Sequence, residues 1–72
     1  MCRSIKPLFN YNPPATKKDV HEASVQFVRK IAGFRSPSKI NEKPFNDAIK
    51  SIEPILTKLI STLKTNAPTK TR

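Results

Sequence analysis

Two stretches of the chain place apolar residues at intervals of three and four, the spacing that forms one face of an α-helix. The first stretch runs from Val20 to Phe34 and keeps its charged residues on other faces. The second is longer and runs from Phe45 to Leu63. These patterns predict two amphipathic helices, at about residues 17–32 and 42–64.

Capping signals predict both ends of the first helix. The Pro13-Pro14 pair disfavours helix before residue 15, and Thr16 with Asp19 three residues later matches a capping box. Gly33 is the only glycine and follows the last apolar positions, where a left-handed C-cap residue is favoured. The first helix is therefore expected to span residues 17–32.

The second helix is expected to begin after Asn41, which is a favoured N-cap residue. Ile40 is placed to pack on Phe45 as a hydrophobic staple, and Pro44 falls in the first turn, where its missing N–H costs nothing. Pro54 interrupts the helix, but the apolar spacing continues across it. We therefore expect one helix with a kink near Pro54 rather than two helices.

The remaining segments are predicted to be an arm, a loop and a tail. Residues 1–15 hold apolar side chains among three prolines and suit an extended arm that packs on the helices. Residues 33–41 contain Pro37 and form a loop, and the polar residues 65–72 form a flexible basic tail without packing partners. The predicted fold class is all-α: an antiparallel two-helix hairpin in a single domain over residues 1–64, with an extended N-terminal arm packed on it and a disordered C-terminal tail.

Composition narrows the expected partners, cofactors and cellular location of the protein. The 72 residues carry a net charge of +9, which favours a polyanionic partner such as nucleic acid or an acidic protein. One cysteine and one histidine exclude an internal disulfide and a zinc site within one chain, so no metal and no cofactor is expected. No apolar run reaches the length of a membrane span, and the start of the chain is unlike a signal peptide. A cytoplasmic location follows.

The densest group of cations surrounds the predicted loop, where Glu42 is the only acid. Guanidinium, ammonium and hydroxyl groups there suit phosphate or carboxylate oxygens. The candidate contact residues are Arg29, Lys30, Arg35, Ser36, Ser38, Lys39 and Lys43.

Other interpretations of this patch stay open. Arg29 and Lys30 also favour a helix C-terminus through the helix dipole, and Lys39 and Lys43 are equally typical of solvated surface. Phe34 fits either a base-stacking role or the core. A helix-turn-helix is disfavoured, because its turn has three or four residues and this loop has eight or nine.

No arrangement of residues indicates catalysis. Cys2 beside Arg3 is the one candidate for thiol chemistry, since nearby cations favour the thiolate, and His21 has no spacing that pairs it with a nucleophile. We therefore predict a non-enzymatic binding or accessory module that uses its basic loop face to engage an acidic partner or nucleic acid. The alternative is a structural subunit that forms a homodimer or docks on another protein through its second helix.

Nearly the whole chain also carries a family resemblance. The stretches concerned are Met1-Cys2-Arg3-Ser4-Ile5, Leu8-Phe9-Asn10-Tyr11 with Pro13-Pro14-Ala15-Thr16, Gln26 to Arg35, and Pro37-Ser38-Lys39 with Asn41-Glu42 and Phe45. The likeness continues more weakly at Leu59, Leu63, Thr65 and Ala67-Pro68. They resemble the domain-of-unknown-function 2277 family of short basic proteins with no established activity. The resemblance implies a compact single-domain protein and transfers no catalytic residue.

Overall fold

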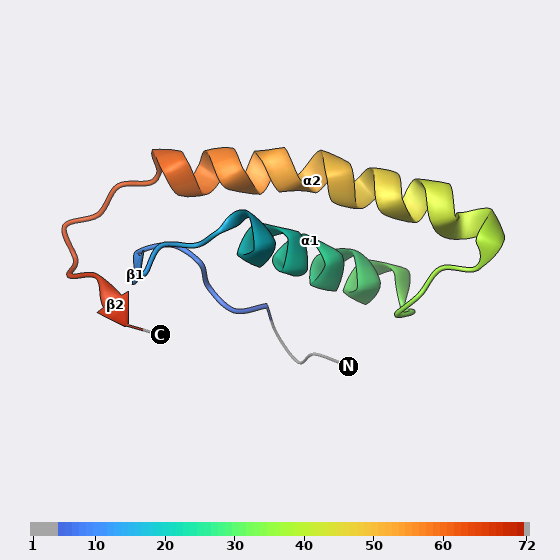
Figure 1. The fold of residues 1–72 in the computed structure, drawn as a ribbon, viewed down its shortest axis with the longest axis horizontal. Helices are drawn as coiled ribbons and strands as arrows, with labels where there is room; N and C mark the ends of the chain where they lie inside the picture. The colour runs from blue at the N-terminus through green and yellow to red at the C-terminus, as the bar shows by residue number, and fades with distance from the viewer. Residues whose placement is uncertain (1–4, 72) are drawn as a thin grey trace.

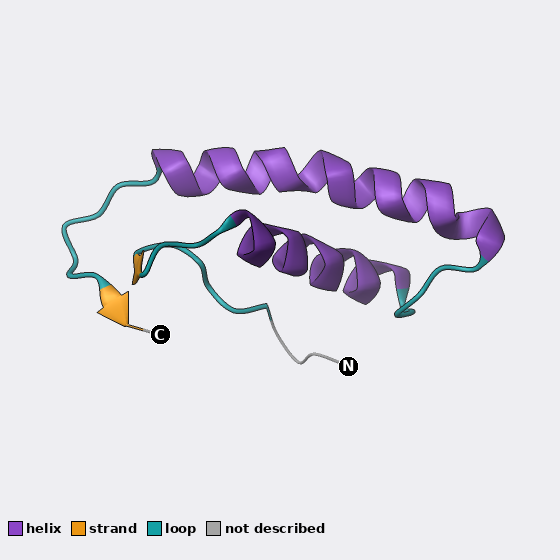
Figure 2. Cartoon of the chain, viewed as in Figure 1, coloured by secondary structure: helices purple, strands orange, loops and turns teal. Residues whose placement is uncertain are grey.

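A computed structural model of the chain describes residues 5–71 as a helical hairpin. Its two helices run antiparallel, side by side, in a molecule that measures 45 × 23 × 16 Å (Figure 1). Two short strands lie near the ends of the described chain, and loops connect the elements (Figure 2). In chain order the elements are β1 (Tyr11–Asn12), α1 (Lys17–Ala32), the 3-10 turn η1 (Lys39–Asn41), α2 (Glu42–Thr62) and β2 (Lys70–Thr71).

Helix α1 has the predicted bounds and the predicted caps. The Thr16 hydroxyl accepts the N–H of Asp19 at 3.2 Å, and the Asp19 carboxylate accepts the N–H of Thr16 at 2.9 Å. Gly33 adopts a left-handed conformation with φ of 85°, and its N–H donates to the carbonyl of Arg29 at 2.8 Å. These bonds satisfy backbone groups that a helix otherwise leaves unpaired at its ends.

The start of α2 differs from the sequence-based expectation. Asn41 precedes the helix, but its side chain makes no capping bond and donates instead to the Ser38 hydroxyl at 3.2 Å. The reason is that η1 leads into α2 with helical backbone, so Asn41 does not adopt the extended conformation of a capping residue. The predicted staple is also wrong, because Ile40 is 86% exposed and Phe34 stacks on Phe45 instead, with ring centroids 5.7 Å apart.

Helix α2 runs without a break through Pro54, as the continuous apolar spacing predicted. It ends at Thr62, two residues before the expected bound, and the N–H of Leu63 donates to the carbonyl of Leu59 at 3.0 Å. None of the helices in the described part of the chain has the length and apolarity needed to cross a membrane.

The core consists of two small clusters between the layers. The buried members of the first come from the arm and α1, and those of the second come from both helices. Ser24 is fully buried, and its hydroxyl donates to the carbonyl of Val20 at 2.9 Å, so that no polar group is left unpaired there. The buried apolar residues are Leu8, Val20 and Ala23 in the first cluster and Val28, Phe45 and Ile49 in the second.

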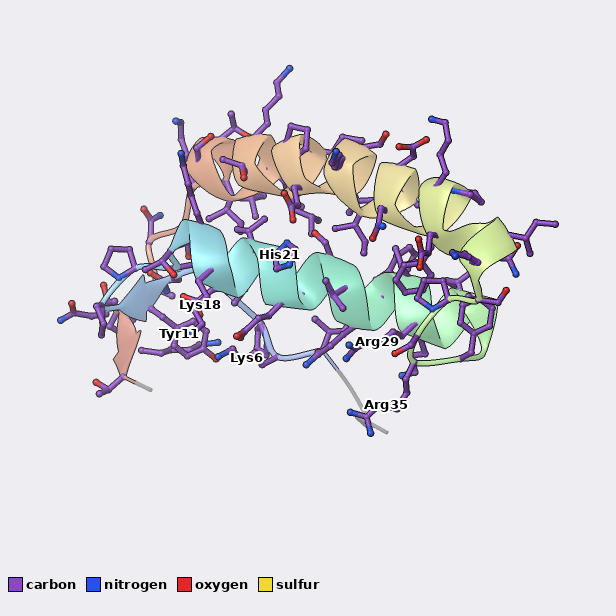
Figure 3. All side chains as sticks on the ribbon, turned by 45° about the vertical axis from the view of Figure 1, so that its right-hand side comes forward. Lys6, Tyr11, Lys18, His21, Arg29 and Arg35 are labelled. Carbon is purple, nitrogen blue, oxygen red and sulfur yellow. The ribbon has the colours of Figure 1, made fainter. Side chains whose placement is uncertain are left out.

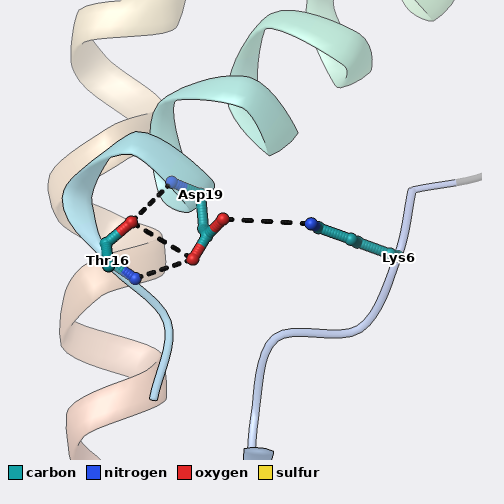
Figure 4. A network of polar contacts seen from close by, with 3 residues as sticks. All are labelled: Lys6, Thr16 and Asp19. Atoms are coloured by element: carbon teal, nitrogen blue, oxygen red, sulfur yellow. Dashed lines mark hydrogen bonds and ion pairs between the residues drawn. The ribbon is translucent and has the colours of Figure 1, made fainter. Parts of the chain in front are cut away.

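The N-terminal arm packs on α1, as predicted, through Leu8, which is 9% exposed. Lys6 of the arm forms an ion pair with Asp19 at 3.8 Å, which connects the arm to the capping box (Figure 4). Asn10 turns the arm with a φ of 67°, a left-handed conformation that asparagine tolerates better than most residues. The arm is therefore the third layer of the fold.

The tail corrects the expectation that nothing in residues 65–72 packs. Strand β2 pairs with β1 in parallel, with Tyr11 opposite Lys70, and the N–H of Lys70 donates to the carbonyl of Asn10 at 2.9 Å. The Asn10 side chain donates to the carbonyl of Pro68 at 3.1 Å. Main-chain and polar side-chain groups hold the tail here, and the Lys70 ammonium lies 5.8 Å from the centroid of the Tyr11 ring, so the absence of apolar side chains in the tail did not exclude the pairing.

Candidate partner-binding surface at the connector

The connector between the helices, residues 33–41, lies at one end of the long axis of the molecule, opposite the two strands (Figure 1). The predicted cations lie there because Arg29 and Lys30 are in the last turn of α1, Lys43 is in the first turn of α2, and Arg35 and Lys39 lie between the two helices. Figure 3 shows Arg29 and Arg35 on the side of α1 that is turned away from α2. We call this group of residues, 29–43, the connector end.

Arg29 holds the connector in place. Its Nε donates to the carbonyl of Arg35 at 2.9 Å, across six residues of chain, and the residue is only partly exposed. A guanidinium has five N–H donors, so its other donors remain available to an anion. Arg29 therefore combines a structural contact with a cation at the surface.

Lys43 and Ser38 have partners within the protein. The ammonium of Lys43 lies 3.0 Å from the Asp47 carboxylate, one helical turn away, with side chains 85% and 56% exposed. An exposed pair of this kind contributes about 0.3–0.5 kcal/mol, and it weakens the attraction of Lys43 for an external anion. The Ser38 hydroxyl accepts a bond from Asn41 and keeps its own hydrogen for another acceptor.

Arg35 and Lys39 are the two cations between the helices whose side chains are solvent-exposed. Both are exposed, and within residues 5–71 no carboxylate lies at ion-pairing distance from either side chain. Ser36 and Lys30 are exposed as well. Of the seven predicted contact residues, Arg35 and Lys39 are thus the best placed to receive an acidic group.

The sequence interpretation missed the apolar part of this surface. Ile40 was expected to pack on Phe45, yet it is the most exposed of the large apolar side chains in the described chain, next to Lys39. Phe34 is 37% exposed, and its ring lies against Phe45. The sequence held one signal of an exposed apolar residue here. Phe34 and Ile40 are both large apolar residues that could pack on Phe45, and only one of them takes that place.

Outside the connector, His21 and Glu53 form the one ionisable pair that joins α1 to α2 in the described part of the chain. No group of three or more His, Cys, Asp or Glu side chains among residues 5–71 is arranged to hold a metal ion. Cys2, the candidate for thiol chemistry, lies outside the described residues.

Comparison with known proteins places the chain in a family. A family model described as "Uncharacterized conserved protein (DUF2277)" matches residues 1–72, so the chain belongs to this family. No curated protein and no solved structure matched the chain.

Proposed function

For this member of the DUF2277 family, we propose a role as a non-enzymatic binding module whose connector end engages an acidic protein. One observation carries the proposal: Ile40, 86% exposed, stands between the exposed cations Arg35 and Lys39 on one side and the start of α2 on the other. An apolar side chain held in water among cations suits a partner that offers both carboxylates and apolar contact.

The charge of the protein supports an acidic partner. A net charge of +9 on 72 residues attracts anions over long range and raises the rate of encounter at low salt. The connector end holds five cations and a single acid, Glu42, so the surface around the exposed Ile40 is positively charged. Long-range attraction and short-range apolar contact then act at the same place.

A protein suits this surface better than a nucleic acid does. Proteins that bind single strands stack bases on exposed aromatic rings, and here Phe34 stacks on Phe45, while the exposed apolar side chain is aliphatic. Reading of the major groove by a helix-turn-helix requires a turn of three or four residues, which is shorter than the connector. Contact with phosphate groups remains the competing outcome of the test.

The test measures binding of three probes by fluorescence anisotropy at low and at moderate salt. The probes are a helical peptide that alternates glutamate and leucine on one face, a polyglutamate peptide, and a mixed-sequence RNA. Three protein variants are compared with the original chain: Lys39→Glu at the connector, Ile40→Ser beside it, and Lys58→Glu as a matched control. Lys58 is exposed on α2, so its reversal changes the net charge equally but at another place.

We expect Lys39→Glu to weaken binding of the glutamate-leucine peptide about 3- to 10-fold more than Lys58→Glu does, the equivalent of about 0.7–1.4 kcal/mol. Ile40→Ser is expected to weaken binding of the glutamate-leucine peptide and to leave binding of the polyglutamate peptide unchanged. Equal effects of the two charge reversals would contradict the proposal, because they would show that only net charge matters. Tighter, Lys39-sensitive binding of the RNA would assign the surface to nucleic acid instead.

A further inference from the structure

The end of the molecule opposite the connector is a second cationic surface. The two strands pair there, where the arm, the start of α1 and the tail after α2 come together (Figure 1). Figure 3 shows Lys6, Tyr11 and Lys18 on this half of the molecule. Residues 6–18 and 63–71, which we call the strand end, hold no acid and five cations: Lys6, Lys17, Lys18, Lys64 and Lys70.

The charge of the strand end is largely uncompensated within the described part of the chain. Asp19, which directly follows this set, already caps α1 and lies 3.8 Å from Lys6. No carboxylate of the described residues lies at ion-pairing distance from Lys64 or Lys70. The Lys70 ammonium lies 5.8 Å from the centroid of the Tyr11 ring, at the surface of the arm. An external anion therefore meets two lysines that no described acid neutralises.

An open cavity lies beside these lysines, between the arm and the residues that follow α2. Its volume is about 660 Å³, within the range of about 300–1,000 Å³ that is typical of small-ligand sites. Two apolar side chains line it, one of them a half-buried aromatic ring, and its other lining side chains are polar. The lining residues are Phe9, Asn10, Leu63, Lys64, Thr65 and Asn66.

The polar side chains of the cavity keep hydrogen-bonding groups for a ligand. The Asn10 amide donates to the carbonyl of Pro68 at 3.1 Å, which leaves its side-chain oxygen as an acceptor. The Thr65 hydroxyl accepts the N–H of Ala67 at 3.0 Å and keeps its own hydrogen as a donor. Asn66 is exposed and adds an amide with both kinds of group. The cavity therefore offers donors, acceptors and an ammonium beside an aromatic ring.

A nucleotide of a single strand carries the groups that match this set. The face of its base stacks on an aromatic ring, the edge of the base carries donors and acceptors, and the phosphates carry charge. In a duplex the bases are already paired and stacked, so Phe9 would have no base to receive. The connector end differs, because its most exposed apolar side chain, Ile40, is aliphatic and the ring of Phe34 is stacked on Phe45.

We propose that the strand end binds single-stranded nucleic acid, with an unpaired base stacked on Phe9 and the neighbouring phosphates on Lys64 and Lys70. The three lysines of the arm and of the first turn of α1 extend the cationic surface that the backbone of the strand follows. Stacking accepts any base, so binding is expected to depend little on sequence. The site lies at the end opposite the connector, so this proposal and the proposed function can each fail without the other.

The test is fluorescence anisotropy of the full chain with a mixed-sequence single-stranded RNA of about 12 nucleotides and with the duplex of the same sequence, over a series of salt concentrations. Phe9→Leu removes the ring but keeps an apolar side chain, and Phe9→Tyr keeps the ring. Lys64→Ala removes the ammonium of the cavity. Lys50→Ala is the matched control, because Lys50 is also exposed but lies on α2 outside both ends of the molecule. Circular dichroism records the helix content of every variant.

The single strand is expected to bind more tightly than the duplex. Phe9→Leu is expected to weaken binding of the single strand at least about fivefold and to leave binding of the duplex unchanged, whereas Phe9→Tyr is expected to retain binding of both. Lys64→Ala is expected to reduce the dependence of log affinity on log salt by about 0.7, the value for one phosphate contact with a single strand. Lys50→Ala is expected to leave this dependence as it is.

Several results would overturn the proposal. They are duplex binding as tight as single-strand binding, an unchanged affinity of Phe9→Leu for the single strand, and equal salt dependence of Lys64→Ala and Lys50→Ala. If Phe9→Leu loses its helices, Lys64→Ala decides, because Lys64 is exposed and lies outside the core. Binding of the RNA that Lys39→Glu removes and Lys64→Ala leaves intact would also overturn it, and would assign the RNA to the connector end.

Discussion

Replacing Leu8 by alanine tests whether the N-terminal arm is part of the core. Leu8 is 9% exposed and lies in one cluster with Val20 and Ala23 of α1. The arm is also held by Ile5, which is partly buried against the same cluster, by the Lys6–Asp19 pair and by the two-residue strand β1. Within residues 5–15, Leu8 is the one apolar side chain that is buried, and the truncation removes its contact with the helices.

The expected loss of stability is about 2–3 kcal/mol. Complete burial of a leucine side chain contributes about 1.5–3 kcal/mol, and Leu8 is removed from water over nearly all of its surface. Truncations of leucine to alanine cost about 2–5 kcal/mol, and the lower half applies here because the arm has room to collapse onto the space that is left. For a chain of this size the free energy of unfolding is only about 4–11 kcal/mol, so the loss is large.

Thermal unfolding followed by circular dichroism at 222 nm measures the effect. A loss of about 2 kcal/mol corresponds to a fall in Tm of roughly 8–16 °C for a domain of this length. Ile40→Ala is the control, because Ile40 is 86% exposed and its truncation is expected to change Tm by no more than about 3 °C. A fall in Tm for Leu8→Ala no larger than that of the control would refute the role of the arm in the core.

Three further substitutions test the local structure by the same unfolding measurement. Thr16→Ala removes the capping bond to Asp19 and is expected to lower the free energy of unfolding by about 1 kcal/mol. The control is Thr57→Ala, which removes a hydroxyl that donates to the carbonyl of Glu53 within α2 and is expected to cost less than half as much; equal losses would contradict the capping argument. Gly33→Ala places a Cβ in open space but at a φ of 85°, so backbone strain alone is expected to lower the free energy of unfolding by about 1–2 kcal/mol. An unchanged Tm would show that the C-cap is not left-handed in solution. Removal of residues 70–72 deletes β2 and is expected to lower stability by less than about 1 kcal/mol, since its bonds are exposed to water; a larger loss would give the tail a part in the core.

The helices were predictable because their signals are local. Thr16, Asp19 and Gly33 fix the ends of α1 through bonds between neighbours in the sequence, and the structure has them where the sequence indicated. The continuous helix across Pro54 followed from an apolar spacing that the proline does not interrupt. Interactions of this kind depend on residues at most four positions apart.

The parts that sequence reasoning missed depend on competition between distant groups. The sequence analysis placed Ile40 on Phe45, whereas in the structure Phe34 takes that place and Ile40 is exposed. The pairing of β1 with β2 joins main-chain groups almost sixty residues apart and leaves no side-chain pattern. The predicted basic patch does lie at one end of the hairpin, but which of its cations are already engaged, such as Lys43 with Asp47, depends on rotamers that no spacing specifies.

The bond from Arg29 to the carbonyl of Arg35, with the stacking of Phe34 on Phe45, has a consequence for the rates of binding at the connector. Ordering a residue of free loop costs about 1–2 kcal/mol of conformational entropy, and these contacts impose that cost when the protein folds rather than when a partner arrives. For a partner of the proposed kind, a loop that is ordered beforehand leaves less of this cost to binding, so the same contacts hold the complex more tightly. Loosening the connector is therefore expected to raise the dissociation rate of such a partner without removing a single cation.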